Sequence, residues 1–187
     1  MESKKKLNIV AFTGAGISAS AGIPTFLDIP GIKDKLSVEF KQKHPEEFNK
    51  AINLLKDNVK DKQPTKAHKI LSQLNIPIIT MNVDNLHNLA GSKEVVEIHG
   101  NYLKDNIVLY GETMHDSDKA IGLIGKIAKL AKENSEEAYL LFIGTSMQTA
   151  FANYMAILAE SLGVKTLYID KDADSEVEEF FKLMGVL

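Results

Sequence analysis

Hydrophobic residues recur along the chain in short runs, separated by longer segments that have helical spacing. Six runs are almost continuously apolar, as expected for strands that are covered on both faces of a sheet. These predicted strands are LNIVAF (7–12), IPIIT (76–80), VVEI (95–98), NIVLY (106–110), YLLFIG (139–144) and KTLYI (165–169).

Two of the intervening segments follow the i, i+3, i+4, i+7 spacing that gives a helix one apolar face. In PTKAHKILSQL (64–74), Pro64 is expected in the first turn of the helix. The apolar positions of this segment are Ala67, Ile70, Leu71 and Leu74. The segment 118–134 repeats the pattern. Strands that alternate with helices predict an α/β fold with a parallel, Rossmann-like sheet flanked by helices and right-handed crossovers.

The segment 29–63 interrupts this alternation because it contains no strand-like run. Its pattern predicts two or three short helices with polar faces, inserted after the first loop. A chain of 187 residues suits one domain with a small insertion. We therefore expect residues 1–187 to form a single domain with a reduced helical insertion at about 29–63.

Composition restricts the classes of partner. The chain is 44% hydrophobic and 25% charged, with a formal net charge of −3, which is typical of a globular protein without general affinity for nucleic acid. No run approaches the roughly 20 apolar residues of a membrane span. We interpret MESKKKLNIV as a polar leader to the first strand, not a signal peptide. We thus expect a cytoplasmic protein without nucleic-acid or membrane partners.

Two residue types are missing, and their absence restricts the chemistry. All 22 basic residues are lysines, so the chain has no guanidinium group to hold a phosphate or carboxylate by two hydrogen bonds. The chain also has no cysteine, which excludes disulfides, thiolate nucleophiles and zinc sites built from cysteine.

The segment FTGAGISASAGIPTF (12–26) follows the first predicted strand, where open α/β sheets bind ligands. Gly14 and Gly16 permit a close approach of backbone to ligand. A helix that begins near Ile17 would direct free N–H groups at a phosphate. Residue 19 is alanine, so the spacing is not G-x-G-x-x-G, and a tight structural turn is the alternative.

Polar residues also follow the second predicted strand, in TMNVDNLHNLAG (80–91). Asn82 and Asp84 are placed to contact a ligand, and the alternative is that they cap the next helix and interact with its dipole. His68 and His87 are interpreted as structural hydrogen-bonding residues, with His87 bracing this loop.

Two further strand ends carry similar features. EIHGN (97–101) places His99 where a histidine can act in acid–base chemistry at neutral pH, or as a plain loop residue. GTSMQTA (144–150) is a second phosphate or ribose loop, or an N-cap turn. Four such segments at one edge of a parallel sheet are what a dinucleotide cleft requires.

Together these segments resemble the sirtuins, NAD-dependent protein lysine deacylases with a Rossmann-like core. Residues 14–27 are similar to the family loop G-A-G-x-S-x-x-S-G-I-P-x-F-R, and residues 80–91 to T-Q-N-I-D-x-L-H-x-x-A-G. The His-Gly pair is His99 and Gly100. PTKAHKIL resembles the family's P-x-x-A-H helix, VLYGE its V-x-F-G-E segment and GTSMQTAFA its G-T-S-L-x-V-x-P-A loop. The order is kept from residue 7 to about 170.

The resemblance implies a role for each matched position. NAD would lie with its pyrophosphate on the Gly-rich loop, its adenosine toward residues 144–146 and Asp170, and its nicotinamide and ribose at Asn82 and Asp84. The implied catalytic residues are His99, as the base that deprotonates a ribose hydroxyl, and Asn82. The implied cofactor-binding residues are Gly14, Ala15, Gly16, Ser18, Pro24, Thr25, Phe26, Met81, Asn82, Asp84, His99, Gly144, Thr145, Ser146 and Asp170. The residues implied in binding peptide by strand pairing are Tyr110, Gly111 and Glu112.

The sequence also departs from the family pattern. Sirtuins usually carry a four-cysteine zinc ribbon between the His-Gly pair and V-x-F-G-E, whereas here NYLKDNIV connects them directly, and we expect no metal site. The arginine of the family loop is Leu27, the glutamine of T-Q-N-I-D is Met81, and the family asparagine after the last strand is Asp170.

The resemblance implies an NAD-dependent deacylase that acts on an acylated-lysine protein or peptide and yields nicotinamide and O-acyl-ADP-ribose. ADP-ribosyl transfer or NAD hydrolysis is the alternative. A third alternative is a non-catalytic protein that binds NAD or ADP-ribose. The retention of His99 and Asn82 argues against this alternative. The sequence does not indicate the acyl chain or the oligomeric state.

Overall fold

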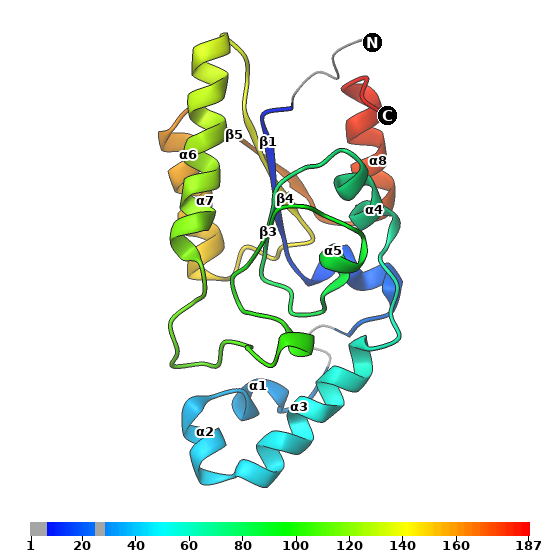
Figure 1. The fold of residues 1–187 in the computed structure, drawn as a ribbon, viewed down its shortest axis with the longest axis vertical. Coiled ribbons are helices and arrows are strands. Elements are labelled where there is room, and N and C mark those ends of the chain that lie inside the picture. The colour runs from blue at the N-terminus through cyan, green and yellow to red at the C-terminus, as the bar shows by residue number, and fades with distance from the viewer. Residues whose placement is uncertain (1–6, 25–28) are drawn as a thin grey trace.

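The computed structural model describes residues 7–24 and 29–187 (Figure 1). These residues contain a five-stranded parallel sheet with the strand order β3-β2-β1-β4-β5. The strands are β1 (Ile9–Thr13), β2 (Ile78–Thr80), β3 (Val95–Glu97), β4 (Tyr139–Ile143) and β5 (Lys165–Ile169). The α/β fold with a parallel sheet, predicted from the alternating pattern, is confirmed.

Helices connect the strands. The α-helices are α1 (Ile32–Lys35), α2 (Val38–Lys43), α3 (Pro45–Val59), α4 (Lys66–Gln73), α5 (Leu86–Leu89), α6 (Ser117–Asn134), α7 (Ala150–Ser161) and α8 (Ala173–Leu183). Two 3₁₀ helices, η1 (Ala15–Ala21) and η2 (Tyr102–Lys104), follow β1 and β3. None of the helices in the described ranges is long and apolar enough to cross a membrane.

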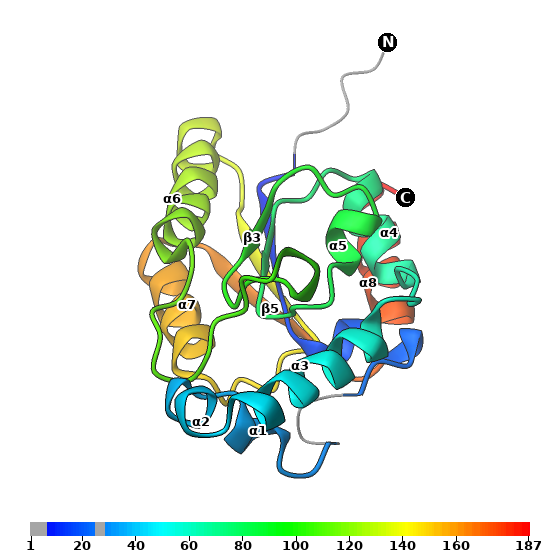
Figure 2. The same cartoon turned by 60° about the horizontal axis from the view of Figure 1, so that its bottom comes forward.

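The sheet is covered on both faces, as Figures 1 and 2 show, and this explains its continuous apolar runs. Val10 and Phe12 of β1 point to the face covered by α6 and α7, where they join the larger apolar cluster. Ile9 and Ala11 point to the opposite face, where they pack with α4 and α8. β1 is therefore buried along its whole length at the centre of the fold.

The helices α1, α2 and α3 lie beyond the carboxyl ends of the strands (Figure 2). The apolar face of α3, with Phe48, Leu55 and Val59, packs against Val83 and Tyr102 from the loops that follow β2 and β3. The helical segment therefore forms one wall of the edge at which the strands end.

Two local predictions are wrong. Residues 106–110 do not join the sheet, because Tyr110 instead makes an isolated parallel bridge with Ser37. Pro64 precedes α4 rather than lying in its first turn, since Thr65 is the N-cap and its hydroxyl accepts from the N–H of His68. The helix predicted to begin near Ile17 is present and spans Ala15–Ala21, and it is a 3₁₀ helix, which is wound more tightly than an α-helix.

Candidate active site

The loops that follow β1 and β4 are packed directly on each other. Gly16 N–H donates to Gly144 O at 2.9 Å, and Gly14 N–H donates to Ile143 O at 3.0 Å. A Cβ on Gly16 would lie 2.6 Å from Gly144 Cα, and one on Gly14 would lie 2.7 Å from Gly144 O. Gly144 itself has φ +60°, which favours glycine. Close contact between two loops thus accounts for all three glycines.

The Gly-rich loop offers fewer free donors than a helix end. The N–H of Ile17 donates to Gly14 O at 3.2 Å, and that of Gly16 is bonded to Gly144. The prediction that a helix near Ile17 directs free N–H groups outward is therefore wrong for these two residues. Within the described ranges, Ala15 N–H is the group at this turn that has no backbone acceptor.

A buried hydrogen-bond network joins the loops that follow β1 and β2. The Ser18 hydroxyl donates to Asp84 Oδ2 at 2.6 Å. The Asn82 amide donates to Gly14 O at 3.0 Å and to Ser18 Oγ at 3.3 Å. Asn82 is thus held by the Gly-rich loop, and among the described residues no hydrogen bond reaches its amide oxygen.

Asp84 is held by a second bond, because its Oδ1 accepts from the N–H of Leu86 at 3.0 Å. This contact stabilises the first turn of α5, which is the structural role that the sequence offered as the alternative for Asp84. Asn82 does not cap that helix, whose N-cap is Asn85 with φ +67°. Burial raises the pKa of Asp84, and the bonds from Ser18 and Leu86 oppose that rise.

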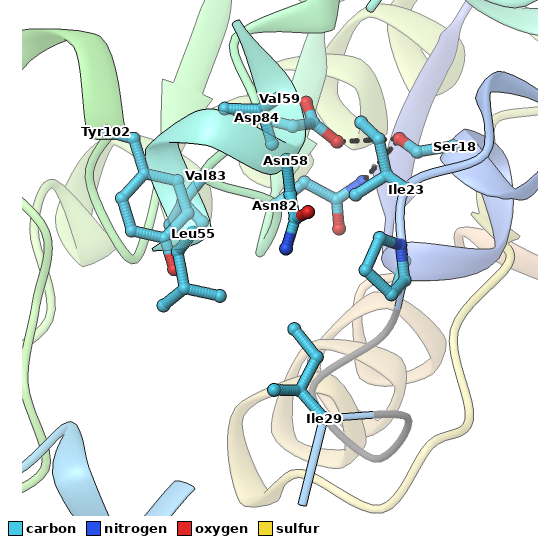
Figure 3. Close-up of a pocket in the computed structure, with 12 residues that line it drawn as sticks. Ser18, Ile23, Ile29, Leu55, Asn58, Val59, Asn82, Val83, Asp84 and Tyr102 are labelled. Atoms are coloured by element: carbon cyan, nitrogen blue, oxygen red, sulfur yellow. Dashed lines mark hydrogen bonds between the residues drawn. The ribbon is translucent and has the colours of Figure 1, made fainter. Parts of the chain in front are cut away.

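These side chains open into a small cavity of about 50 Å³ between the sheet edge and α3 (Figure 3). Its polar groups are Ser18, Asn58, Asn82 and Asp84, and its remaining wall is mostly apolar. The apolar and aromatic residues of the wall are Ala15, Ile23, Pro24, Ile29, Leu55, Val59, Val83 and Tyr102. A cavity with apolar sides and a few convergent polar groups suits a small planar ring with a polar substituent.

His99 lies in a second and larger cavity of about 490 Å³. The ring is half-buried, and this burial lowers its pKa, so the neutral imidazole is favoured at neutral pH. Val83 and Tyr102 line both cavities, which are therefore adjacent. The other residues of the larger cavity are Lys33, Leu36, Ile107, Val108, Leu109, Tyr110, Gly111, Glu112, Met114, Gln148, Thr149, Ala150 and Phe151.

Tyr110, Gly111 and Glu112 line the larger cavity together, but part of their backbone is already paired. Tyr110 N–H donates to Leu36 O at 2.8 Å, and Tyr110 O accepts from Val38 N–H at 3.1 Å. Glu112 N–H donates to Leu109 O at 3.0 Å. Among the residues that the structure describes, Gly111 and the Glu112 carbonyl have no backbone partner, so a peptide could pair with them before any rearrangement.

The remaining predicted residues lie around the same sheet edge, with different exposure. Thr145 is buried and its hydroxyl donates to Ile143 O at 3.4 Å, whereas Ser146 and Asp170 are exposed. Met81 accepts a hydrogen bond at its Sδ from the Thr149 hydroxyl at 3.4 Å. The predicted residues Thr25 and Phe26, together with Leu27, lie outside the described residues.

Behind the site lies a buried network whose partners the motifs did not indicate. His87 Nε2 lies 2.9 Å from Thr13 Oγ1, and Thr13 is bonded to Thr80 Oγ1 at 2.8 Å. Thr80 Oγ1 in turn accepts from Asn82 N–H at 3.0 Å. A polar threonine at the last position of both buried strands is the sequence signal that could have indicated this network. It fixes the backbone from which Asn82 projects.

The described residues contain no group of three or more histidine, cysteine or acidic side chains able to hold a metal ion. They do contain what a dinucleotide needs at a sheet edge: two loops in contact and a polar cavity beside them. The two loops follow β1 and β4, on either side of the point where the strand order reverses, which is where such sheets bind ligands. The residues present therefore fit a dinucleotide better than a metal ion.

Comparison with known proteins places these features in a family. A sequence model described as the Sir2 family matches residues 14–105, which include the Gly-rich loop, Asn82, Asp84 and His99. An "NAD-dependent protein deacetylase" of Sulfolobus acidocaldarius is 29% identical over 202 residues, covering 84% of this chain and 76% of that protein. An "NAD-dependent protein deacylase" of Aquifex aeolicus is 40% identical over 124 residues, covering 60% of this chain and 52% of that protein. The chain thus aligns with about half the length of the latter.

Solved structures share the fold at lower sequence identity. The structure "Sir2 bound to acetylated peptide" has a TM-score of 0.78 and 23% identity, covering 96% of this chain and 94% of that chain. A "Sir2 homolog-NAD complex" has a TM-score of 0.80 and 21% identity, covering 95% of this chain and 89% of that chain. The family predicted from the motifs is confirmed: the chain belongs to the Sir2, or sirtuin, family.

Proposed function

We propose that this protein is an NAD-dependent protein lysine deacylase that forms nicotinamide and O-acyl-ADP-ribose from NAD and an acylated lysine. One observation carries the proposal. The cavity that holds Asn82 and Asp84 shares a wall, made of Val83 and Tyr102, with the cavity that holds His99. A site for cleaving NAD and a site for completing acyl transfer are therefore adjacent. The names of the relatives support the same activity.

The chain's own residues fit NAD in this arrangement. The Ala15 N–H, at the contact between the two glycine loops, is placed to donate to a phosphate. Asn82 has its amide nitrogen bonded to Gly14 and Ser18, so its amide oxygen is oriented and able to accept. When bound, NAD supplies an electrophilic ribose carbon with nicotinamide as its leaving group.

Asn82 and Asp84 would hold the nicotinamide ribose and carboxamide in the smaller cavity. The carboxylate of Asp84 is fixed by Ser18 and Leu86, so it does not need to reorganise as positive charge develops at the ribose. The apolar wall made by Ile23, Ile29 and Leu55 would restrict the access of water to that centre.

His99 would act as general base. Because burial lowers its pKa, the ring is neutral at neutral pH and can accept a proton from a ribose hydroxyl. That proton transfer would let the hydroxyl oxygen bond to the acyl carbon after the acyl oxygen has bonded to the ribose carbon. The acyl carbon–nitrogen bond would then break, the lysine amine would leave with a proton, and a water molecule would hydrolyse the remaining linkage to yield O-acyl-ADP-ribose. This chemistry uses one base and oriented polar groups, and we propose that it proceeds without zinc.

A second candidate function is NAD hydrolysis or ADP-ribosyl transfer. It is favoured by the pairing of Tyr110 with Leu36 and Val38, which occupies part of the segment proposed to bind peptide. In this case water or another nucleophile would replace the acyl oxygen, and Asn82 and Asp84 would keep their roles.

The test is incubation with NAD and an acetyl-lysine peptide, with all products measured by mass spectrometry. We expect nicotinamide, deacetylated peptide and O-acetyl-ADP-ribose in equal amounts. His99→Ala should lower the rate of deacetylation by about 100-fold or more, the range that a general base contributes. Free ADP-ribose, or ADP-ribosylated protein, with intact acetyl-peptide would support the second candidate. NAD that stays unchanged would refute both.

A further inference from the structure

Tyr102 carries a buried hydroxyl group that the chain itself does not satisfy. The residue is 3% exposed, and within the part of the chain that the structure describes its Oη has no hydrogen-bond partner. A buried hydroxyl without a partner costs free energy, and replacing it with hydrogen would normally relieve that cost. A buried hydroxyl of this kind in a native structure indicates a hydrogen-bond partner that the chain itself does not supply, such as a bound ligand.

The position of Tyr102 is fixed by its backbone. Its N–H donates to Val83 O at 3.0 Å, which attaches it to the loop between Asn82 and Asp84. The preceding residue, Asn101, is fully buried, and its amide donates to both Asn85 Oδ1 and Glu97 Oε1 at 2.7 Å. Tyr102 is therefore held rigidly beside the two residues proposed to contact nicotinamide.

Tyr102 also forms part of the wall of the smaller cavity. In Figure 3 its ring stands beside Val83, with the hydroxyl end drawn toward Leu55 of α3. Leu55 lines this cavity and does not line the larger cavity that contains His99. Burial raises the pKa of Tyr102, so its hydroxyl remains protonated and is a donor at neutral pH.

We propose that Tyr102 is a further ligand-contacting residue of this site, whose hydroxyl hydrogen-bonds the nicotinamide carboxamide of bound NAD. This inference rests on the proposed function, which places nicotinamide in the smaller cavity. The carboxamide has an oxygen that accepts and an NH₂ group that donates, so a fixed hydroxyl can pair with it in either sense. Asn82 and Asp84 would hold the ligand from the sheet edge, and Tyr102 from the opposite side, near α3.

Tyr102→Phe tests this because it removes the hydroxyl and keeps the ring. In the ligand-free protein the substitution should raise the melting temperature by about 2–4 °C, since a buried unpaired hydroxyl is relieved. In the same protein, calorimetric titration should show NAD binding weakened about two- to tenfold, the range of one neutral hydrogen bond. Binding of ADP-ribose, which lacks nicotinamide, should be unchanged.

Tyr139→Phe is the matched control. Tyr139 lies at the amino end of β4, away from the site, and its hydroxyl donates to Glu137. This variant should not raise the melting temperature and should not change NAD binding.

Three results would contradict the inference, and they can be told apart. Equal NAD binding by wild type and Tyr102→Phe would refute the role of Tyr102 and leave the proposed function intact. Equal weakening of NAD and ADP-ribose would place the effect outside the nicotinamide cavity. Weaker binding of acetyl-lysine peptide alone would assign the hydroxyl to the larger cavity. A wild-type protein that binds NAD no better than buffer would refute the proposed function itself.

Discussion

The rings of His68 and His87 lie 4.5 Å apart, centroid to centroid, behind the loops of the candidate active site. His68 Nδ1 lies 2.8 Å from Thr65 Oγ1, and His87 Nε2 lies 2.9 Å from Thr13 Oγ1. The other ring nitrogens, His68 Nε2 and His87 Nδ1, are buried without a partner in the described structure. Each ring is therefore accommodated as a neutral group, and a proton on either would be buried with no counter-ion in contact among the described residues.

Stability should consequently decrease in mild acid. Burial lowers the pKa of His68 to about 4, against a weaker opposing effect of Asp174. Burial and the neighbouring His68 lower the pKa of His87 well below its ordinary value of 6.5. The unfolded chain thus binds more protons than the folded chain below about pH 6.5. The contribution of these neutral rings is complete above that pH and is lost as the pH falls toward the folded pKa values.

Denaturant unfolding between pH 4.5 and 8 would measure this dependence. His68→Gln should lower the free energy of unfolding at pH 8. Below pH 6.5 it should also reduce the slope of that free energy against pH, by the equivalent of up to one bound proton. A His68→Gln slope equal to that of wild type would mean that His68 does not titrate between the two states.

Asn82→Ala should suppress nicotinamide chemistry far more than it affects stability. The substitution removes two hydrogen bonds, to Gly14 O at 3.0 Å and Ser18 Oγ at 3.3 Å, each worth about 1 kcal/mol. We expect a melting temperature lower by about 2–8 °C and, in a radiolabelled nicotinamide exchange assay, a rate lower by about 100-fold or more.

Asn88→Ala provides the matched control for that measurement. Asn88 is exposed, and its amide likewise makes two bonds, to Asn85 Oδ1 at 2.9 Å and Glu97 Oε1 at 2.7 Å. Asn88→Ala should lower the rate of nicotinamide exchange only slightly. If both variants exchange nicotinamide at the same rate, Asn82 serves only to hold the loop.

The sequence predicted which residues lie at the carboxyl edge of the sheet, because the patterns that mark strands and the residues after them are local. Buried strands read as apolar runs, and polar residues after those runs must meet at one edge when the strands are parallel. Asn82, Asp84 and His99 could be placed in this way from their positions alone. Tyr102 could not, because the pattern does not reveal that a hydroxyl is buried without a partner. The strand predicted at 106–110 failed for a related reason: an apolar run also fits a segment that packs against helices, as Leu109 does.

Stability and activity should not depend on zinc. The chain contains no cysteine, and the described ranges contain no cluster of three potential ligands. The segment that connects η2 to Tyr110 is held by backbone bonds, such as that from Val108 N–H to His99 O at 2.9 Å, and these bonds do not need a metal. Elemental analysis of the purified protein should find no stoichiometric zinc, and a strong chelator should leave the melting temperature unchanged. A lower melting temperature with chelator, restored by zinc, would contradict this.

Gly16→Ala should be strongly destabilising, whereas the same change at two positions on α6 should stabilise the protein. At Gly16 the new Cβ would lie 2.6 Å from Gly144 Cα, and both are backbone positions that no side-chain rotation can relieve. The two loops must separate, which breaks the bond from Gly16 N–H to Gly144 O. On α6, a Cβ at Gly122 or Gly125 would meet nothing within 4 Å. Alanine at either position should raise the free energy of unfolding by about 0.5–1 kcal/mol, because glycine costs that much in a helix.

The measurement is denaturant unfolding of Gly16→Ala and Gly125→Ala together with NAD binding by each. We expect a loss of several kcal/mol and of detectable NAD binding for the first, and a small gain of stability with unchanged binding for the second. One combination of stability and binding results would show why position 16 requires glycine. If Gly16→Ala keeps wild-type stability but loses NAD, the residue is needed for ligand approach instead of loop contact, and the close packing of the loops after β1 and β4 would have to relax at little cost.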